Sequence, residues 1–287
     1  SMGFYIRTDW LKKLNLEIPK TVDEYYQALK AFREKDPNGN GKQDEVPYFY
    51  RDKGIDGLIQ LWGGRAGWHI KDGKYVHGKM QPEFKTAMTN LAKWYNEGLI
   101  DKEIYSRGKS SREILLGDNV GGSTNDWFSS TGAFNENLKG KISGFEFKVI
   151  PPPADVNGKV KQEFGRSSLP GYGWAISVNN QYAAETMKYM DFWYSEQGLR
   201  IANYGVEGVD YNIVEGKPVY TDKVLKAEGG APTYLRYAGQ NEFGTRMFIE
   251  SEIQAMTQHA REGFKLYSDN DYVLDQLPPL SFTTEEE

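Results

Sequence analysis

Oxygen-bearing side chains alternate around a glycine in the segment 36–47. Counted from Asp36, they stand at positions 1, 3, 5 and 9, and Gly41 stands at position 6. A calcium ion takes roughly six to eight oxygen ligands, and an EF-hand loop supplies them from such positions with a glycine at the sharp turn. Position 12 is Pro47 instead of the usual glutamate, so the closing carboxylate must come from Glu45. The spacing predicts a calcium site formed by Asp36, Asn38, Asn40, Lys42 (through its carbonyl), Asp44 and Glu45.

The early closure of this loop bears on its role. A loop that closes two residues early is not expected to open and shut a helix pair as a calcium sensor does, so we expect a permanent structural ion. The alternative is a solvated turn without an ion, because Asn, Asp and Gly are the residues that turns prefer.

Aromatic residues are the compositional outlier of the chain. They form 14% of its 287 residues, with 19 Tyr and 7 Trp. This excess predicts a surface that stacks on a ligand, because an aromatic face packs well on the C–H groups of a sugar ring. The tryptophans on apolar faces of expected helices are assigned to the core: Trp10, Trp94 and Trp193. The tryptophans beside glycines or polar caps are the candidates to face a ligand: Trp62, Trp68, Trp127 and Trp174.

Catalytic chemistry has weaker support in the sequence. A glycosidase needs two carboxylates about 5–10 Å apart, and Asp126 and Glu207 are the candidates near expected cleft loops. A glycoside hydrolase or another carbohydrate-active enzyme therefore stays open as the alternative, although both residues fit better as acceptors for sugar hydroxyls or as a helix cap. His69, His77 and His259 are too scattered for a metal-ligand motif.

Composition and motifs exclude several other classes. The net charge is −5 with acids and bases intermixed, so the sequence carries no basic footprint for nucleic acid. The absence of cysteine excludes a disulfide scaffold, a thiolate metal site and a cysteine nucleophile. The sequence has no Gly-x-Ser-x-Gly elbow, no Walker loop and no apolar run approaching the ~18 residues of a transmembrane helix.

Short apolar strands alternate with amphipathic helices along the chain, which is typical of an α/β fold. The strands are expected at 4–7, 46–50, 120–124, 145–150 and 173–178. The helices are expected at 21–32, 82–97, 183–194 and 241–266, the third with Met187, Met190 and Trp193 inside. Thr21 and Glu24 form a capping box at the start of the first of these helices, and the calcium loop follows its C-terminus.

Several stretches resemble the extracellular solute-binding proteins of carbohydrate ABC importers, and in particular their calcium-containing, alginate-oligosaccharide-binding branch. These stretches are 4–11, 36–47, 97–101 and 204–211. The resemblance implies a periplasmic-binding-protein type II fold: two doubly wound lobes that close on an oligosaccharide without catalysis. It further implies a membrane permease as partner and an extracytoplasmic location, periplasmic or lipid-anchored. Carried over by motif, Trp127 matches a sugar-stacking ring, and the strand end Pro47–Tyr48 matches a wall of the cleft.

The resemblance also implies a domain organisation. Residues 4–150 and 206–287 are expected to form the calcium-bearing lobe, and 164–203 a strand and helix of the second lobe. Family members are roughly twice as long, so the chain is expected to lack segments at both ends. We expect a dimer or a swapped assembly to follow from this, and weak sugar binding.

The expected ligand-binding residues combine rings with polar groups for hydroxyls. They are Trp127, Tyr48, Trp62, Trp68, Arg51, Asp126, Tyr204 and Glu207. Arginines offer a further recognition of sugar carboxylates, which fits an acidic glycan such as alginate. The candidates are Arg51, Arg65, Arg166, Arg236 and Arg246.

Overall fold

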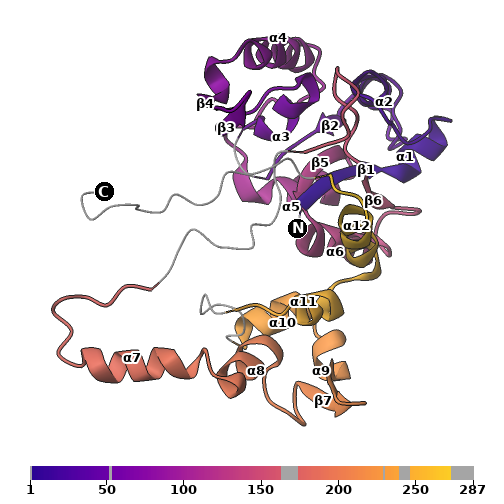
Figure 1. Ribbon diagram of the computed structural model, residues 1–287. Helices are drawn as coiled ribbons and strands as arrows, with labels where there is room; N and C mark the ends of the chain where they lie inside the picture. The colour runs from indigo at the N-terminus through magenta and orange to yellow at the C-terminus, as the bar shows by residue number, and fades with distance from the viewer. Residues whose placement is uncertain (1, 52–53, 163–173, 229, 239–245, 273–287) are drawn as a thin grey trace. The chain divides into compact units, whose positions relative to one another are not determined.

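The computed structural model describes residues 2–51, 54–162, 174–228, 230–238 and 246–272 (Figure 1). The chain forms two compact units: unit 1 comprises Ser1–Ser167 and Gln258–Glu287, and unit 2 comprises Ser168–Thr257. The sequence-based division placed 206–287 with the first lobe, whereas the part up to Thr257 groups here with unit 2. Within the described residues, no helix has both the length and the apolar character to cross a membrane.

Unit 1 alternates strands and helices, as the sequence predicts. Its elements are β1 (Met2–Arg7), α1 (Thr8–Lys13), α2 (Val22–Glu34), β2 (Val46–Tyr48), α3 (Asp56–Ile59), η1 (Gln60–Trp62), β3 (Trp68–Lys71), β4 (Lys74–His77), η2 (Gly78–Met80), α4 (Pro82–Asn96), η3 (Gly108–Ser110), α5 (Ser111–Gly117), β5 (Gly121–Trp127), α6 (Phe128–Leu138), β6 (Phe147–Ile150) and α12 (Gln258–Ser268).

A four-stranded mixed sheet in the order β2-β5-β1-β6 organises unit 1. Strand β1 pairs antiparallel with both β5 and β6, and β2 pairs parallel with β5. The register sets Gly3 opposite Asp126 and Met2 opposite Trp127. Helix α2 packs on β2 and β5, and α6 and α12 pack on β6. The expected α/β class is confirmed.

Alternation along β1 divides the interior into two apolar layers. Phe4 and Ile6 are fully buried in the core cluster that also contains Tyr25 and Leu29 of α2. Tyr5 points to the other face, where its ring stacks on Phe147 at 5.1 Å between ring centroids. Successive side chains of a strand face opposite sides, so a strand covered by helices on both faces is apolar at every position.

Helix α12 is attached to the sheet by the hydroxyl of Tyr267. This hydroxyl donates to the Ile150 carbonyl at 3.0 Å and accepts the Phe4 amide at 3.0 Å. A Cβ at Gly3 would come within 2.5 Å of the Tyr267 ring, so glycine at this position lets the helix approach the strand. Tyr267 thus joins the far end of unit 1 in sequence to the neighbouring strands β1 and β6.

The local signals of the sequence are also confirmed. Thr21 accepts the Glu24 amide at 3.2 Å, which is the first half of the predicted capping box. The Glu24 carboxylate in return accepts the amide of Lys20, one residue before the cap. Asp72 and Gly73 adopt positive φ angles of 51° and 74°, as a tight hairpin turn requires.

Unit 2 is mainly helical. Its elements are α7 (Ala183–Phe192), α8 (Glu196–Tyr204), β7 (Tyr211–Val214), β8 (Lys217–Tyr220), α9 (Asp222–Leu225), α10 (Ala231–Tyr237) and α11 (Ile249–Ala255). A small core gathers Tyr204, Tyr211 and Tyr220 around the fully buried Val224. The Tyr220 hydroxyl closes this core by donating to the Asn203 carbonyl at 2.7 Å.

Several expectations for this part of the chain are wrong. Residues 174–178 form no strand and Val178 is 97% exposed, because the described residues offer this segment no strand to pair with. Helix α7 exists, but Met187 is 58% exposed and the helix buries no residue. The expected long helix 241–266 is instead two helices, since Met256 between them has an extended backbone with ψ 145°; residues 241–245 lie outside the described part.

Replacing Tyr267 by phenylalanine tests the attachment of α12. Tyr267→Phe leaves the buried Phe4 amide without its acceptor, so we expect the free energy of unfolding to fall by about 1–3 kcal/mol. Urea denaturation followed by circular dichroism measures the change. Tyr105→Phe, at a 59% exposed position, is the control and should change stability by less than about 0.5 kcal/mol. Equal stabilities of the two variants would contradict the assigned role.

Candidate functional site

Trp127 lies at the last position of β5, where the strand turns directly into α6. Its backbone is extended, with φ −65° and ψ 131°, and its amide donates to Asp126 Oδ1 at 2.7 Å. The side chain is 41% exposed, in contrast to the fully buried residues just before it. The strand end therefore presents an aromatic ring to solvent from a rigid backbone.

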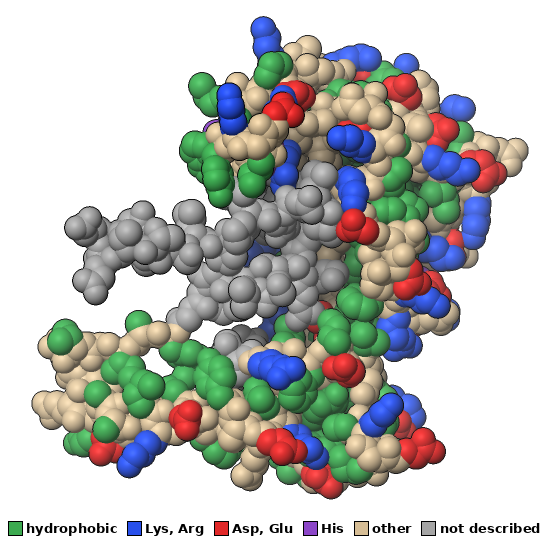
Figure 2. All heavy atoms as spheres, viewed as in Figure 1, with side chains coloured by type: hydrophobic (Ala, Val, Ile, Leu, Met, Phe, Trp, Pro, Cys, Tyr) green, Lys and Arg blue, Asp and Glu red, His purple; other side chains and the backbone are tan. Residues whose placement is uncertain are grey.

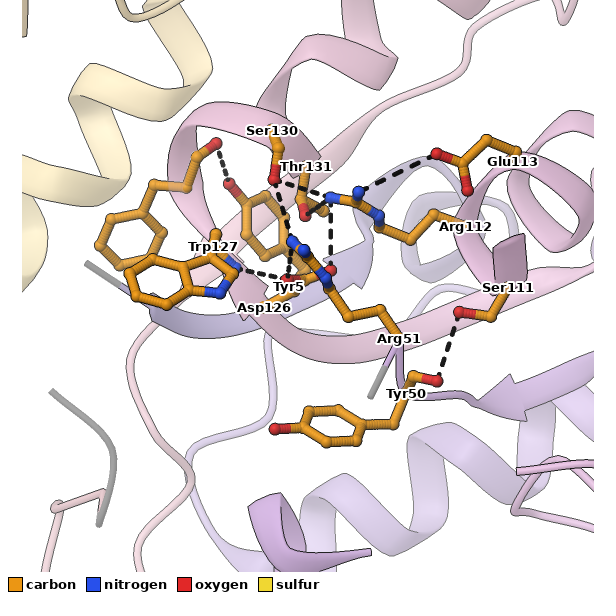
Figure 3. Close-up of polar contacts among 11 residues, drawn as sticks. Tyr5, Tyr50, Arg51, Ser111, Arg112, Glu113, Asp126, Trp127, Ser130 and Thr131 are labelled. Atoms are coloured by element: carbon orange, nitrogen blue, oxygen red, sulfur yellow. Dashed lines mark hydrogen bonds and ion pairs between the residues drawn. The ribbon is translucent and has the colours of Figure 1, made fainter. Parts of the chain in front are cut away.

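A buried charge cluster supports this strand end (Figure 3). Asp126 is fully buried, and its carboxylate lies 3.4 Å from Nη1 of Arg51 and 3.5 Å from Nη1 of Arg112. Arg112 also donates to the hydroxyls of Ser130 and Thr131, at 2.8 and 3.0 Å. These contacts join the end of β2, helix α5 and helix α6 around one carboxylate.

Two arginines face one buried carboxylate in this cluster, and the second carboxylate, Glu113, is largely exposed and lies 3.9 Å from Arg112. Burial raises the pKa of Asp126 above its ordinary value, while Arg112, the Trp127 amide and Arg51 act in the opposite direction. Arg51 is held at only 3.4 Å by Asp126 and by Ser130, and its buried Nε has no hydrogen-bond partner among the described residues. A guanidinium with an unsatisfied donor beside an exposed indole can bind an oxygen-rich ligand by donating hydrogen bonds to its oxygens.

Two predicted ligand-binding residues of unit 1 are buried instead. Tyr48 is fully buried in the core, with burial raising the pKa of its hydroxyl, and that hydroxyl has no hydrogen-bond partner in the described structure. Trp62 is 6% exposed and packs against Trp94 at 5.1 Å between ring centroids. The glycines around Trp62 shape the chain near a core ring, which the sequence pattern alone does not distinguish from a ligand-facing one.

The remaining candidates lie away from this cluster in sequence or in another unit. Trp68 is 63% exposed on the β3–β4 hairpin, which forms its own two-stranded sheet. In unit 2, Tyr204 is 5% exposed in the core, and the exposed Glu207 accepts the Tyr211 hydroxyl at 3.3 Å. Tyr204 is therefore a core ring within its own unit.

The other arginines named from the sequence are placed separately. Arg65 lines a cavity near the hairpin, and Arg236 belongs to α10. The guanidinium of Arg246 lies 5.8 Å from the ring centroid of Phe248. Arg166 falls outside the described residues. Sequence reasoning missed Arg112, because its contact with Asp126 is set by the packing of α5 and α6, which no local pattern records.

The predicted calcium loop is closed by side-chain oxygens. Asp36 accepts the amides of Gly39, Asn40 and Gly41 at 2.9, 3.0 and 2.8 Å. Gly41 has a φ of 78°, the left-handed conformation expected at the sharp turn. The side-chain amides of Asn38 and Asn40 donate to the Asp44 carboxylate at 3.2 and 3.1 Å.

Glu45 is the exceptional residue of this loop. It is 1% exposed, and both of its carboxylate oxygens are buried without a hydrogen-bond partner in the described structure. Burial raises its pKa, and the neighbouring carboxylates of Asp36 and Asp44 raise it further. A buried carboxylate without a donor is costly, so this arrangement fits a cation ligand. Within the described residues, no three His, Cys, Asp or Glu side chains converge as a metal cluster.

Comparison with known proteins finds a matching family and several relatives. Residues 1–199 match the family model described as bacterial extracellular solute-binding protein. Lipoprotein LipO of Bacillus subtilis strain 168 is 26% identical over 286 residues, covering 90% of this chain and 53% of LipO. The fructooligosaccharide ABC transporter substrate-binding protein FusA of Streptococcus pneumoniae serotype 4 is 30% identical over 246 residues, covering 81% of this chain and 44% of FusA.

A solved structure agrees more closely. The crystal structure of alginate-binding protein AlgQ2 without calcium ion matches with a TM-score of 0.86 and 39% identity, covering 96% of this chain and 58% of that chain. The likeness confirms the expected periplasmic-binding-protein type II fold class. The chain spans about half the length of the curated relatives it matches.

Substitution of Asp126 tests the buried charge cluster. Asp126→Ala removes the shared partner of two arginines and the acceptor of the Trp127 amide, so we expect the free energy of unfolding to fall by about 3 kcal/mol. Asp118→Ala, at an exposed position in the same unit, is the control. Urea denaturation measures both variants. If both variants change the free energy of unfolding of the parent chain by the same amount, the carboxylate does not support this strand end.

Proposed function

Because the chain belongs to the bacterial extracellular solute-binding proteins, we propose that it captures an oligosaccharide as the substrate-binding component of an ABC importer. The observation that carries this proposal is the exposed indole of Trp127 beside the incompletely paired guanidinium of Arg51. The indole offers an apolar face to a pyranose ring, and Arg51 offers donors to its oxygens. Asp126 orients both groups through contacts to the Trp127 amide and to Arg51.

The charge of the cluster supports an acidic sugar as the ligand. The two arginines outnumber the one buried carboxylate, and a guanidinium matches a carboxylate with two parallel hydrogen bonds. AlgQ2, which matches this chain at 39% identity, is named for binding alginate. The permease of the importer would be the protein partner, and the location would be extracytoplasmic, as a periplasmic or lipid-anchored protein.

We further propose a structural calcium ion in the loop 36–47. Its ligands would be the side chains of Asp36, Asn38, Asn40, Asp44 and Glu45 with the carbonyl of Lys42, and the unpartnered buried carboxylate of Glu45 supports this set. The ion would neutralise three carboxylates and join the end of α2 to the start of β2.

The hydrolase alternative finds less support. Asp126 is fully buried and engaged with two arginines, whereas a catalytic acid must reach the glycosidic oxygen. The compared relatives are named as a lipoprotein and as binding proteins. We therefore propose capture without chemical conversion of the sugar.

The domain organisation proposed for the intact protein is a cleft between two lobes. We propose that residues 4–150 and 206–287 belong to the lobe that carries calcium and Trp127, and that 164–203 belong to the other. A dimeric or swapped assembly of this chain is a further part of the proposal.

Removal of calcium tests the loop. A ligand at 100 times its dissociation constant stabilises the folded state by about 2.7 kcal/mol, so chelation by EGTA should lower the melting temperature. Asp36→Ala and Glu45→Gln should each abolish the difference between calcium and EGTA. Asp23→Ala, at an exposed position on α2, should preserve it. Absence of calcium from carefully purified protein by metal analysis would contradict the site.

Substitution of Trp127 tests the sugar site. Trp127→Ala removes the stacking face, so we expect affinity for an alginate tetrasaccharide to fall at least tenfold while the melting temperature changes little. Isothermal titration calorimetry on this chain and on a version extended at both ends measures the effect. Tyr95→Ala, at a 36% exposed position on α4, is the control. Loss of affinity in both variants, or in neither, would overturn the assignment of Trp127.

A further inference from the structure

Unit 1 contains a polar cavity, and none of the residues of the Trp127 cluster lines it. Its volume is about 300 Å³, and its walls come from the loop 60–65, the hairpin residues 69–71, the start of α4 and the segment 155–161. This size is at the lower end of small-molecule sites in proteins. The proposed function leaves this cavity unused.

The cavity has more cationic than anionic side chains in its lining. The cations are Arg65, Lys71, Lys159 and Lys161, and the anions are Glu83 and Asp155. Lys71 Nζ lies 2.6 Å from Glu83 Oε1, and this hydrogen bond holds the pKa of Glu83 below its usual value. That pair neutralises itself, so the other lysines determine what the cavity attracts.

The segment 155–161 places those lysines. Asp155 Oδ1 accepts the amides of Asn157 and Lys159, at 2.7 and 2.9 Å, which shapes the turn that precedes Lys161. Lys161 pairs with Asp271, a residue whose side chain is 89% exposed, and such an exposed pair opens at little cost. The side chain of Lys159 has no ionic partner among the described residues. A negatively charged group can therefore enter without displacing a buried pair.

Close backbone packing forms the wall between the cavity and the hairpin. A Cβ at Gly78 would lie 1.9 Å from the Arg65 carbonyl oxygen, and the Gly78 amide donates to the Gly67 carbonyl at 2.9 Å. His69 is 9% exposed and faces the body of unit 1 from the hairpin. The cavity is thus built by a rigid loop and the inner face of the hairpin.

The outer face of the same hairpin is apolar. Cross-strand pairing sets Ile70 opposite Tyr75 and Trp68 opposite His77, so these side chains share one face. Trp68, Ile70 and Tyr75 are 63%, 55% and 67% exposed. Figure 2 shows hydrophobic side chains protruding at the hairpin, with Lys and Arg side chains beside them. Ile70 belongs both to this face and to the cavity lining, so it connects the two features.

We propose that the cavity and the outer hairpin face form a second carbohydrate site that binds a chain of uronic acid units. A sugar carboxylate enters the cavity and pairs with Lys159 and Lys161. The ring of a neighbouring unit stacks on Trp68 or Tyr75. This inference does not depend on the proposed sugar site at Trp127, with which it shares no residue.

The chemistry of the surface favours a glycan over a protein partner. Lysine is depleted from the centres of protein interfaces, whereas three lysines line this cavity. An acidic glycan offers what both parts need, since its rings have apolar C–H faces and each unit carries a carboxylate. A neutral glycan would leave the lysines without a partner.

Nuclear magnetic resonance of the tryptophan indole groups tests the proposal on this chain. The indole N–H signals of Trp68 and Trp127 are assigned with Trp68→Phe and Trp127→Phe. Trigalacturonate is the probe, and its fully methyl-esterified form, which has no charge, is the matched control. We expect trigalacturonate to shift the Trp68 signal in the parent chain and equally in Trp127→Ala, and the ester to shift it at least tenfold less at the same concentration.

Charge variants separate the cavity from general attraction of an anion. Lys159→Ala should weaken the titration at Trp68 about threefold and Lys159→Glu about tenfold, while Lys85→Ala, an exposed lysine outside the cavity, should leave it unchanged. An unmoved Trp68 signal at millimolar trigalacturonate, or an equal effect of Lys85→Ala, overturns the second site. A shift of the Trp127 signal alone overturns this inference and supports the proposed function. A shift of the Trp68 signal alone supports this inference and counts against the proposed function.

Discussion

The antiparallel pairing of β1 with β5 is the constraint on which the rest of unit 1 depends. It sets Gly3 opposite Asp126 and Met2 opposite Trp127, so the C-terminal end of β5 lies beside the N-terminal end of β1. The hydrophobic residues of β1 are divided between two faces, and a slip of one residue would turn all of them to the wrong side. The position of the Trp127 ring is a consequence of this register.

Charge is concentrated where the sheet ends. Asp126 has no exposed surface, and burial raises its pKa while Arg112, the Trp127 amide and Arg51 act in the opposite direction. A buried carboxylate with such partners is costly to disturb, which makes it a rigid support for groups at the surface. Rigid support matters for a binding protein, because a ring that is already oriented loses less entropy when a ligand arrives.

The two loops rich in glycine have different physical roles. In the loop 36–47, glycine permits the turn and leaves the Glu45 carboxylate buried without a donor, which a cation can satisfy. At the loop 63–67, the absence of a side chain at Gly78 allows close approach to the Arg65 carbonyl, and the loop lines a cavity with more cationic than anionic side chains. Both sites combine a fixed backbone with a charge imbalance that a ligand of opposite charge can complete.

Local patterns in the sequence were sufficient for the α/β class, the capping box at Thr21 and the Asx-rich loop at Asp36. Each depends on residues close in sequence, whose backbone preferences act whatever surrounds them. The exposure of Trp127 was also predicted, because it follows a small-residue strand and precedes a helix.

Burial and long-range pairing were decided only by the tertiary structure. Trp62 and Tyr48 lie in the core because α4 and the sheet close over them, and no local pattern contains that packing. Arg112 meets Asp126 because α5 and α6 pack side by side, and Tyr267 meets Phe4 across nearly the whole chain. The apolar faces of α7 indicated burial, yet they are exposed here, since burial requires a neighbouring element as well as an apolar pattern.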